Sequence, residues 1–283
     1  MGDAIGTSVE FRPRGSFEPL TDMVGGGPFR LRAGQWTDDT SMALCLAISL
    51  VECHGFDARD QMERYCRWAE TGYLSSTGTC FDIGNTIATA LRRFRDTRLP
   101  FCGSSDPRSA GNGCIMRLAP VPIFYSPDMD AAERFAADSA RTTHGAAACI
   151  DASRLLARIL LRAMAGLPKH EVVLDDSTRF AGDAKIAAIA RGDYLTKAES
   201  EIRGSGYVVE SLEAALWCFV RTETFEDAVL RAANLGDDAD TTAAVCGQVA
   251  GGYYGESGIP APWLEKLCLR QEITDLADQL SGC

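Results

Sequence analysis

The sequence predicts an all-α fold, a compact single-domain orthogonal helix bundle over residues 1–283. Three observations support this class. Apolar residues recur at the helical period in many segments, period-2 alternation is scarce, and neither a Pro/Gly-rich linker nor a charge block divides the chain. The expected helices cover residues 41–54, 58–71, 85–95, 130–141, 146–165, 182–190, 208–221, 224–234 and 240–253.

These helices differ in what their composition indicates. The first contains MALCLAISLV and is apolar almost all round, which is typical of a helix at the centre of a bundle. Those between residues 58 and 234 are periodic and are separated by Gly, Pro and Ser/Asp clusters, so their loops can carry special residues. The last contains many small residues, such as Ala243 and Gly247. We expect its backbone to approach a neighbour closely, which could bring two helix starts together.

Composition limits the partners and the location. The chain is 46% hydrophobic and 24% charged, with a net charge of -11 and a pI near 4.8. This negative field disfavours nucleic acid and anionic membranes, but it leaves room for a local basic site for a small anion. No segment resembles a secretion signal or approaches the roughly 20 apolar residues of a membrane span. We therefore expect a cytoplasmic monomer that binds neither nucleic acid nor membrane.

The thiols and imidazoles do not indicate a zinc site or a disulfide framework. The eleven cysteines are an odd number, are scattered through apolar helical patterns and include no C-x-x-C pair. The three histidines are His54, His144 and His170, which lie far apart in the sequence. We expect reduced, mostly buried thiols.

Two acidic clusters stand where helices are expected to start. WTDDTSMAL, residues 36–44, and NLGDDADTTAA, residues 234–244, each combine aspartates with threonines. Either cluster alone is explained by N-capping, because Asp and Thr at a helix start accept hydrogen bonds from free backbone N–H groups. Two clusters with more carboxylates than a cap can use favour instead a hard divalent cation, Mg²⁺ or Mn²⁺, in an oxygen site.

Seven segments carry a family resemblance. They are GDAIGTSVEF (2–11), WTDDTSMAL (36–44), CFDIGNT (80–86), GNGCIMRLAPV (111–121), TTH (142–144), GSGYVVESLEAALWCF (204–219) and NLGDDADTTAAVCGQVAGGYYG (234–255). In this order they resemble the ADP-ribosylglycohydrolases, in particular the bacterial branch typified by the dinitrogenase reductase-activating glycohydrolase. The resemblance implies an all-α fold with a dinuclear Mg²⁺ or Mn²⁺ site at helix N-termini and removal of ADP-ribose from modified side chains.

The resemblance also implies roles for individual residues. The matching metal-binding positions are Thr37, Asp38, Asp39, Asp238, Asp240 and Thr241. Asp237 lies outside this pattern, and we expect it to be a cap or a supporting acceptor. Asp82 is the first candidate for the catalytic acid/base and Glu10 the second. Without the resemblance, Asp82 is equally well explained as a turn residue or helix cap, and Glu10 as an exposed charge.

The substrate side is expected in three further segments. Gly111, Asn112 and Gly113 form a Gly-flanked turn whose backbone N–H groups could approach a pyrophosphate, although most such turns are only turns. By resemblance this loop and His144 contact ADP-ribose, whereas a histidine at a helix junction is more often a cap or a buried hydrogen-bonding residue. Tyr207 has two equal interpretations, core packing or an aromatic wall for the ribose or adenine.

The expected reaction is hydrolysis of the N-glycosidic bond between ADP-ribose and an arginine side chain. Its substrate is an ADP-ribosylated protein, it releases ADP-ribose, and two divalent cations, Mg²⁺ or Mn²⁺, are its cofactors. The alternative is a binding or immunity protein of the same fold that sequesters ADP-ribosylated targets or an ADP-ribosyltransferase without turnover. The complete acidic set, including Asp82, favours the enzyme.

Overall fold

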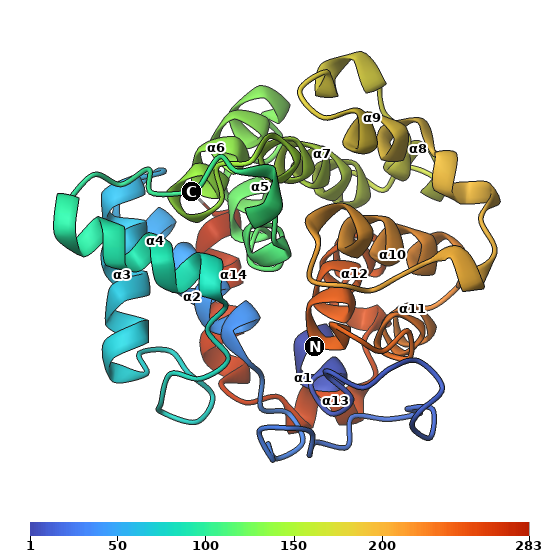
Figure 1. Ribbon diagram of the computed structural model, residues 1–283. Helices are drawn as coiled ribbons and strands as arrows, with labels where there is room; N and C mark the ends of the chain where they lie inside the picture. Colours follow the sequence, from blue (N-terminus) through green and yellow to red (C-terminus); the bar gives the residue numbers. More distant parts are fainter. Residues whose placement is uncertain (283) are drawn as a thin grey trace.

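The computed structural model describes residues 1–282 and confirms the all-α class. This part of the chain contains isolated β-bridges but no β-strand. Figure 1 shows helices that cross at steep angles rather than lying parallel. They are α1 (Gly2–Gly6), α2 (Asp38–Glu52), α3 (Ala58–Thr71), α4 (Asn85–Thr97), α5 (Pro120–Tyr125), α6 (Met129–Thr143), α7 (Ala147–Met164), α8 (Lys169–Val173), α9 (Ala184–Arg191), α10 (Val208–Val220), α11 (Phe225–Ala233), α12 (Ala239–Tyr254), α13 (Ala261–Lys266) and α14 (Arg270–Ser281).

All nine expected helices are present. The largest shift is at α2, which begins at Asp38 rather than at residue 41, so that Asp38 and Asp39 occupy its first turn. The sequence did not predict α1, α5, α8, α13 and α14. Four of these have only five or six residues, which is too short for an apolar period to be recognised.

The apolar interior consists of a large and a smaller cluster, and α2 contributes to both. Leu46 and Leu50 belong to the large cluster, which also includes residues of α7, α10 and α12, whereas Met42 and Cys45 belong to the smaller one with residues of α3 and α4. In Figure 1, α2 to α4 lie on one side of the molecule and α10 to α12 on the other. Most residues of α2 are buried, as expected for a helix that is apolar almost all round.

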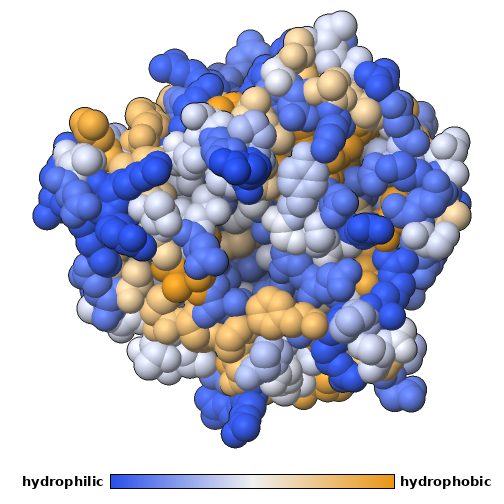
Figure 2. All heavy atoms as spheres, viewed as in Figure 1, coloured by the Kyte–Doolittle hydropathy of each residue, from blue (hydrophilic) through white to orange (hydrophobic). Residues whose placement is uncertain are grey.

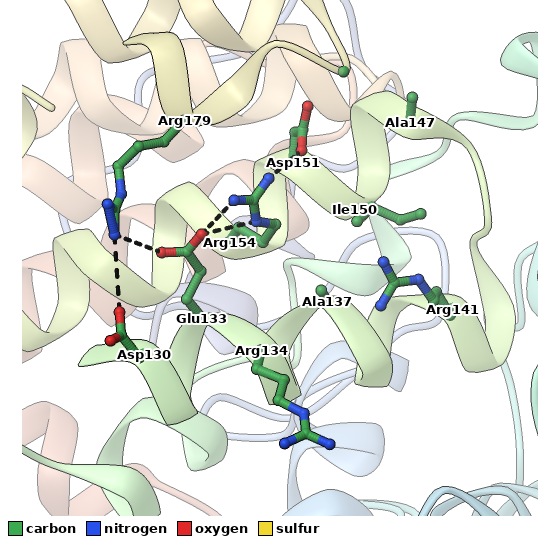
Figure 3. A pocket seen from close by; sticks show the side chains of 11 residues that line it. Asp130, Glu133, Arg134, Ala137, Arg141, Ala147, Ile150, Asp151, Arg154 and Arg179 are labelled. Carbon is green, nitrogen blue, oxygen red and sulfur yellow. Dashed lines mark hydrogen bonds and ion pairs between the residues drawn. The ribbon is translucent and has the colours of Figure 1, made fainter. Parts of the chain in front are cut away.

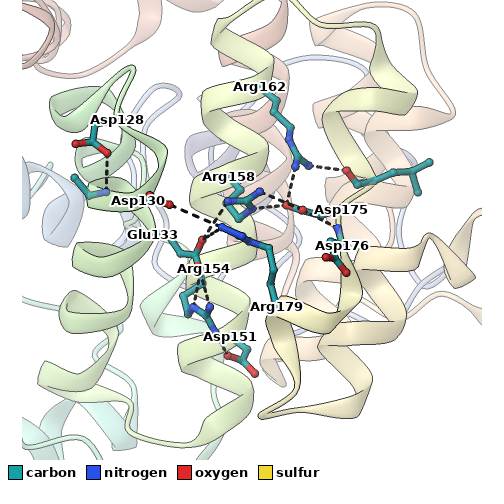
Figure 4. Close-up of polar contacts among 12 residues, drawn as sticks. Asp128, Asp130, Glu133, Asp151, Arg154, Arg158, Arg162, Asp175, Asp176 and Arg179 are labelled. Carbon is teal, nitrogen blue, oxygen red and sulfur yellow. Dashed lines mark hydrogen bonds and ion pairs between the residues drawn. The ribbon is translucent and has the colours of Figure 1, made fainter.

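A network of ion pairs joins α6, α7 and the segment that leads to α9 (Figure 4). Arg154 and Arg158 of α7 both pair with Glu133 of α6. Arg158 and Arg162 also pair with Asp175, at 2.5 and 3.0 Å. Because these charges are largely withdrawn from water, removing one partner would leave the others uncompensated. The network ties α6 and α7 to each other and to the segment that leads to α9.

Two general features bear on the chemistry of the chain. No helix within residues 1–282 is both long enough and apolar enough to cross a membrane. The ten cysteines in the same part of the chain are free thiols, and most of them are buried.

Candidate metal centre and active site

The site is built on the contact between α1 and α12, whose backbones approach very closely. A Cβ atom on Gly2 would lie 1.9 Å from the carbonyl oxygen of Ala243, and one on Gly6 would lie 2.3 Å from that of Ala239. Only glycine fits at these two positions. The small residues of α12 therefore admit a close neighbour, as expected, and this neighbour is α1.

Asp3 of α1 connects this pair to the start of α2. Its carboxylate accepts hydrogen bonds from the backbone N–H groups of Thr37 at 2.9 Å and Thr40 at 3.1 Å. It also accepts from their hydroxyl groups, at 3.0 and 2.6 Å. Asp3 of α1 thus caps α2, a role that was not predicted from the sequence. Thr37 and Asp238, the N-cap residues of α2 and α12, make no side-chain cap bond. N-capping therefore does not explain the acidic clusters.

The two acidic clusters meet in the interior. Thr37 Oγ1 lies 3.3 Å from Asp240 Oδ2, and Thr241 Oγ1 lies 3.3 Å from Asp39 Oδ2. Carboxylate oxygens of Glu10, Asp82 and Asp240 lie within 4.8 Å of one another. The structure brings together all of the predicted metal-binding and catalytic positions, which come from segments up to 231 residues apart (10 to 241).

The buried carboxylates lack a counter-charge from the protein. Asp39 Oδ1 and Asp240 Oδ1 are buried without any hydrogen-bond partner. Burial, and then repulsion from neighbouring carboxylates, raises the pKa of Asp38, Asp39 and Asp240 well above their ordinary value. The same causes raise the pKa of Glu10 to about 9 and that of Asp82 to about 7. Carboxylates arranged in this way need protons or a cation, and an all-oxygen donor set fits a hard divalent ion.

The acids open into a cavity of about 880 Å³. Figure 2 shows a hollow near the centre of the face that is drawn. Glu10, Asp38, Asp82, Asp238 and Asp240 line the cavity together with the Gly111–Gly113 loop and His144. A volume of this size suits a small-molecule ligand.

The Gly111–Gly113 loop lines the cavity, but two of its backbone donors are already used. The N–H group of Gly111 donates to the carbonyl oxygen of Ser109 at 2.8 Å, and that of Asn112 donates to Gly206 at 3.0 Å. The Asn112 side chain instead donates to Asp238 Oδ2 at 2.6 Å. Asn112 therefore holds the carboxylate of Asp238, a candidate metal ligand. The turn sequence did not predict this contact.

His144 lies beneath the loop and is 2% exposed. Arg117 donates a hydrogen bond to Thr143 Oγ1 at 2.6 Å. The Thr143 hydroxyl is therefore free to donate its own hydrogen bond to His144 Nδ1, which is 2.8 Å away. This arrangement favours the tautomer with the proton on Nε2. Burial, and then the charge of Arg117, lowers the pKa of His144 to about 3, so the ring is neutral near pH 7.

Tyr207 and Asp237 lie at the edge of the site. The hydroxyl of Tyr207 accepts a hydrogen bond from Lys185 at 3.2 Å, and its half-buried ring packs against the core beside the cavity, while Ser205 and Gly206 line it. Asp237 lines the cavity, but the N-cap of α12 is Asp238, so Asp237 is not the cap that the sequence suggested.

Another cavity, of about 530 Å³, lies between α6, α7 and residues 179–182 (Figure 3). Three of its four arginines are paired within the protein: Arg154 with Glu133 and Asp151, Arg179 with Asp130 and Glu133, and Arg141 with Asp138. This cavity contains none of the predicted site residues.

Comparison with known proteins gives the family of the chain. A sequence model of the family described as ADP-ribosylglycohydrolase matches residues 1–282. The chain belongs to the ADP-ribosylglycohydrolase family. It is 44% identical over 283 residues to the "ADP-ribosylarginine hydrolase Tri1" of Serratia proteamaculans (strain 568), covering 99% of this chain and 76% of that protein. It is 29% identical to the "ADP-ribosyl-[dinitrogen reductase] glycohydrolase" of Rhodospirillum rubrum, covering 96% of this chain and 88% of the relative.

The fold agrees with this family. A solved structure described as an "ADP-ribosylglycohydrolase-related protein complex" superposes with a TM-score of 0.86 at 41% identity, over 99% of this chain and 93% of that one. The resemblance carried by the seven sequence segments is therefore confirmed. Both acidic clusters contribute residues to the lining of a cavity that is large enough for a small-molecule ligand.

Proposed function

We propose that this protein is a metal-dependent hydrolase that removes ADP-ribose from modified arginine side chains of proteins. The observation that carries the proposal is the buried meeting of two acidic clusters with two carboxylate oxygens left without a partner. Membership of the family supports the reaction class. Relatives named as ADP-ribosylarginine hydrolases, at 44 and 45% identity, support arginine as the acceptor and do not favour the binding-only alternative.

The cofactors in this proposal are two divalent cations, Mg²⁺ or Mn²⁺. The residues that would hold them are Thr37, Asp38, Asp39, Asp238, Asp240 and Thr241. When bound, the cations supply positive charge that offsets these carboxylates and stabilises negative charge on nearby oxygen atoms. The free oxygens of Asp39 and Asp240 support this assignment, because they have no other partner.

Asp82 is the proposed acid/base. It is half-buried at the cavity wall, and burial together with Asp3 and Asp238 raises its pKa to about 7. Bound cations would lower this pKa toward its ordinary value, so the assignment rests on the place of Asp82 at the cavity wall beside Glu10 and Asp240. Cleavage requires a proton on the departing guanidine nitrogen and the removal of one from the attacking water. Glu10, with its pKa raised to about 9, is the second candidate for a proton donor.

The remaining predicted residues bind and orient ADP-ribose. Asn112 holds Asp238 in place through a 2.6 Å hydrogen bond. The neutral His144 offers its Nε2–H group to an oxygen of the ligand, with Gly111 and Gly113 leaving room beside the ring, since a Cβ on Gly113 would lie 2.8 Å from His144 Cε1. Tyr207 packs against the core beside the cavity and is not among its lining residues, so in this proposal it supports the neighbouring Ser205 and Gly206 rather than contacting the ligand.

The test is release of free ADP-ribose from an arginine-ADP-ribosylated peptide, measured with added Mn²⁺ or Mg²⁺ and again after chelation. A serine-linked peptide of the same sequence serves as the comparison for linkage. We expect release from the arginine peptide in the presence of the ion. Tight binding of this peptide without any release would support the sequestering alternative instead.

A further inference from the structure

Phe11 is a large apolar side chain that the fold presents to the site cavity. It directly follows Glu10, lines the cavity and is 65% exposed. Its backbone has a φ of +61°, which is uncommon for a residue other than glycine. Its N–H group donates to the carbonyl oxygen of Asp237 at 2.7 Å, and the N–H group of Asp237 donates to Arg12 at 2.8 Å. The ring is therefore held at the cavity by a fixed backbone and is not buried in the core.

Phe11 is one member of a row of three rings, which we call the aromatic rim (Phe11, Phe29 and Phe81); of the three, Phe11 lines the cavity and the other two pack behind it in the row. The ring of Phe29 lies 6.4 Å from that of Phe11 and 5.1 Å from that of Phe81, measured between centroids. Phe81 directly precedes Asp82. The row thus joins the two sequence neighbours of the proposed proton-transferring acids. Figure 2 shows a band of hydrophobic surface along the lower edge of the central hollow.

The position of the rim decides which part of the substrate it meets. Its two ends adjoin Glu10 and Asp82, whose carboxylate oxygens lie within 4.8 Å of Asp240. The bond to be cleaved must lie at these acids. The adenine of ADP-ribose is separated from that bond by two riboses and two phosphates, so the groups that can lie beside the rim are the acceptor side chain and the ribose attached to it. Of these two, only an acceptor with a planar group can stack on the aromatic rings.

The chemistry of an arginine acceptor suits this surface. A guanidinium group is planar, delocalised and weakly hydrated, and it stacks on aromatic faces. A hydroxyl-linked acceptor such as serine offers neither a planar group nor a positive charge.

We infer that the aromatic rim binds the guanidinium and the aliphatic stem of the ADP-ribosylated arginine, and that Phe11 selects arginine over acceptor side chains without a delocalised cation. The inference rests on the proposed function, which it extends from the linkage to the residue that recognises it. On this inference the rim contacts the acceptor side chain and not the ADP-ribose.

The test compares Phe11→Leu, which keeps an apolar side chain but removes the aromatic face, with the conservative variant Phe11→Tyr. Phe101→Leu is the matched control, because Phe101 is 53% exposed and is not part of the cavity lining. We expect Phe11→Leu to lower kcat/KM for an arginine-ADP-ribosylated peptide by about three- to thirtyfold, the range of a cation–π contact. The inhibition constant of free ADP-ribose should stay the same, and Phe11→Tyr should restore most of kcat/KM.

The possible outcomes separate the two proposals. If the wild type releases no ADP-ribose, the proposed function fails, and the calorimetric affinity of the same peptide still tests the rim through the same variants. If the wild type is active but Phe11→Leu equals Phe101→Leu, the inference is overturned. It is also overturned if the affinity for free ADP-ribose falls as much as kcat/KM, or if Phe11→Tyr is as impaired as Phe11→Leu.

Discussion

Removing divalent cations should destabilise this protein as well as inactivate it. Chelation leaves Asp38, Asp39 and Asp240 buried beside one another without a counter-charge. Two of their oxygens have no hydrogen-bond partner, and each such atom costs about 1–3 kcal/mol when it is left unsatisfied. A cation that binds only the folded state removes this cost and adds its own binding free energy.

The size of the effect follows from linkage. At a free-ion concentration about 1,000 times Kd, binding stabilises the folded state by about 4 kcal/mol. At about 2 cal/mol/K per residue, a chain of this length has an unfolding entropy of roughly 0.6 kcal/mol/K. Chelation should therefore lower Tm by about 7 °C, and added Mn²⁺ should reverse the change.

The stability that is lost on chelation should also depend on pH. Burial and neighbouring carboxylates raise the pKa of Asp82 from 3.8 to about 7 and that of Glu10 from 4.5 to about 9. A carboxyl group whose pKa is higher in the folded state binds more protons there. Its contribution to stability is therefore present below the ordinary pKa and is lost as the pH rises through the folded value. The chelated protein should lose stability between about pH 4 and 9, and the gap to the ion-bound protein should widen.

Differential scanning calorimetry with and without EDTA measures both effects. Asp240→Asn should abolish the response of Tm to the chelator, since Asp240 offers an unpartnered oxygen to the ion. Asp237→Asn on the same segment is the matched control and should retain the response. A melting curve and a turnover rate that are both unchanged in EDTA would refute the metal interpretation.

Three further variants test other parts of the site. Asp82→Asn should keep ion binding and ADP-ribose affinity but lower kcat by roughly two to four orders of magnitude, and near wild-type turnover would move the acid/base role to Glu10. Because the pKa of His144 is depressed from 6.5 to about 3, its contribution to stability is lost as the pH falls below 6.5. Wild type should therefore lose about 2 kcal/mol relative to His144→Gln between pH 7 and 5 in denaturant titrations, and a constant difference would contradict a neutral imidazole. Gly6→Ala should sharply lower Tm because its Cβ would lie 2.3 Å from a carbonyl oxygen of α12, whereas Gly247→Ala, with no atom nearer than 3.5 Å, should melt like wild type; equal melting of the two would argue against the close contact.

Local patterns in the sequence were sufficient to predict most of the helices. Long segments such as α2 and α7 show their apolar period directly, and the acids at the start of α2 and α12 were recognisable from their motifs. The short α1 and α8 have five residues each, and no period can be read from so few.

Contacts between distant segments could not be predicted. An aspartate normally caps its own helix, so nothing in GDAIG indicated that Asp3 would cap α2 across 34 residues of sequence. The same limit applies to Asn112, whose amide holds Asp238 across 126 residues. Phe11 belongs to the GDAIGTSVEF motif, but its exposure depends on the loop that pairs it with Asp237.

The position of α1 determines how firmly the acids of the site are held in place. It packs backbone to backbone on α12 through Gly2 and Gly6, and through Asp3 it holds the first turn of α2. The acids of α2 and α12 are therefore fixed at close range by contacts that do not involve the ion. Since the protein itself keeps these repelling carboxylates together, the site is preorganised, and a cation meets ligands that need not be gathered first. The same contacts hold the carboxylates close together when the ion is removed, which is why chelation is expected to cost stability.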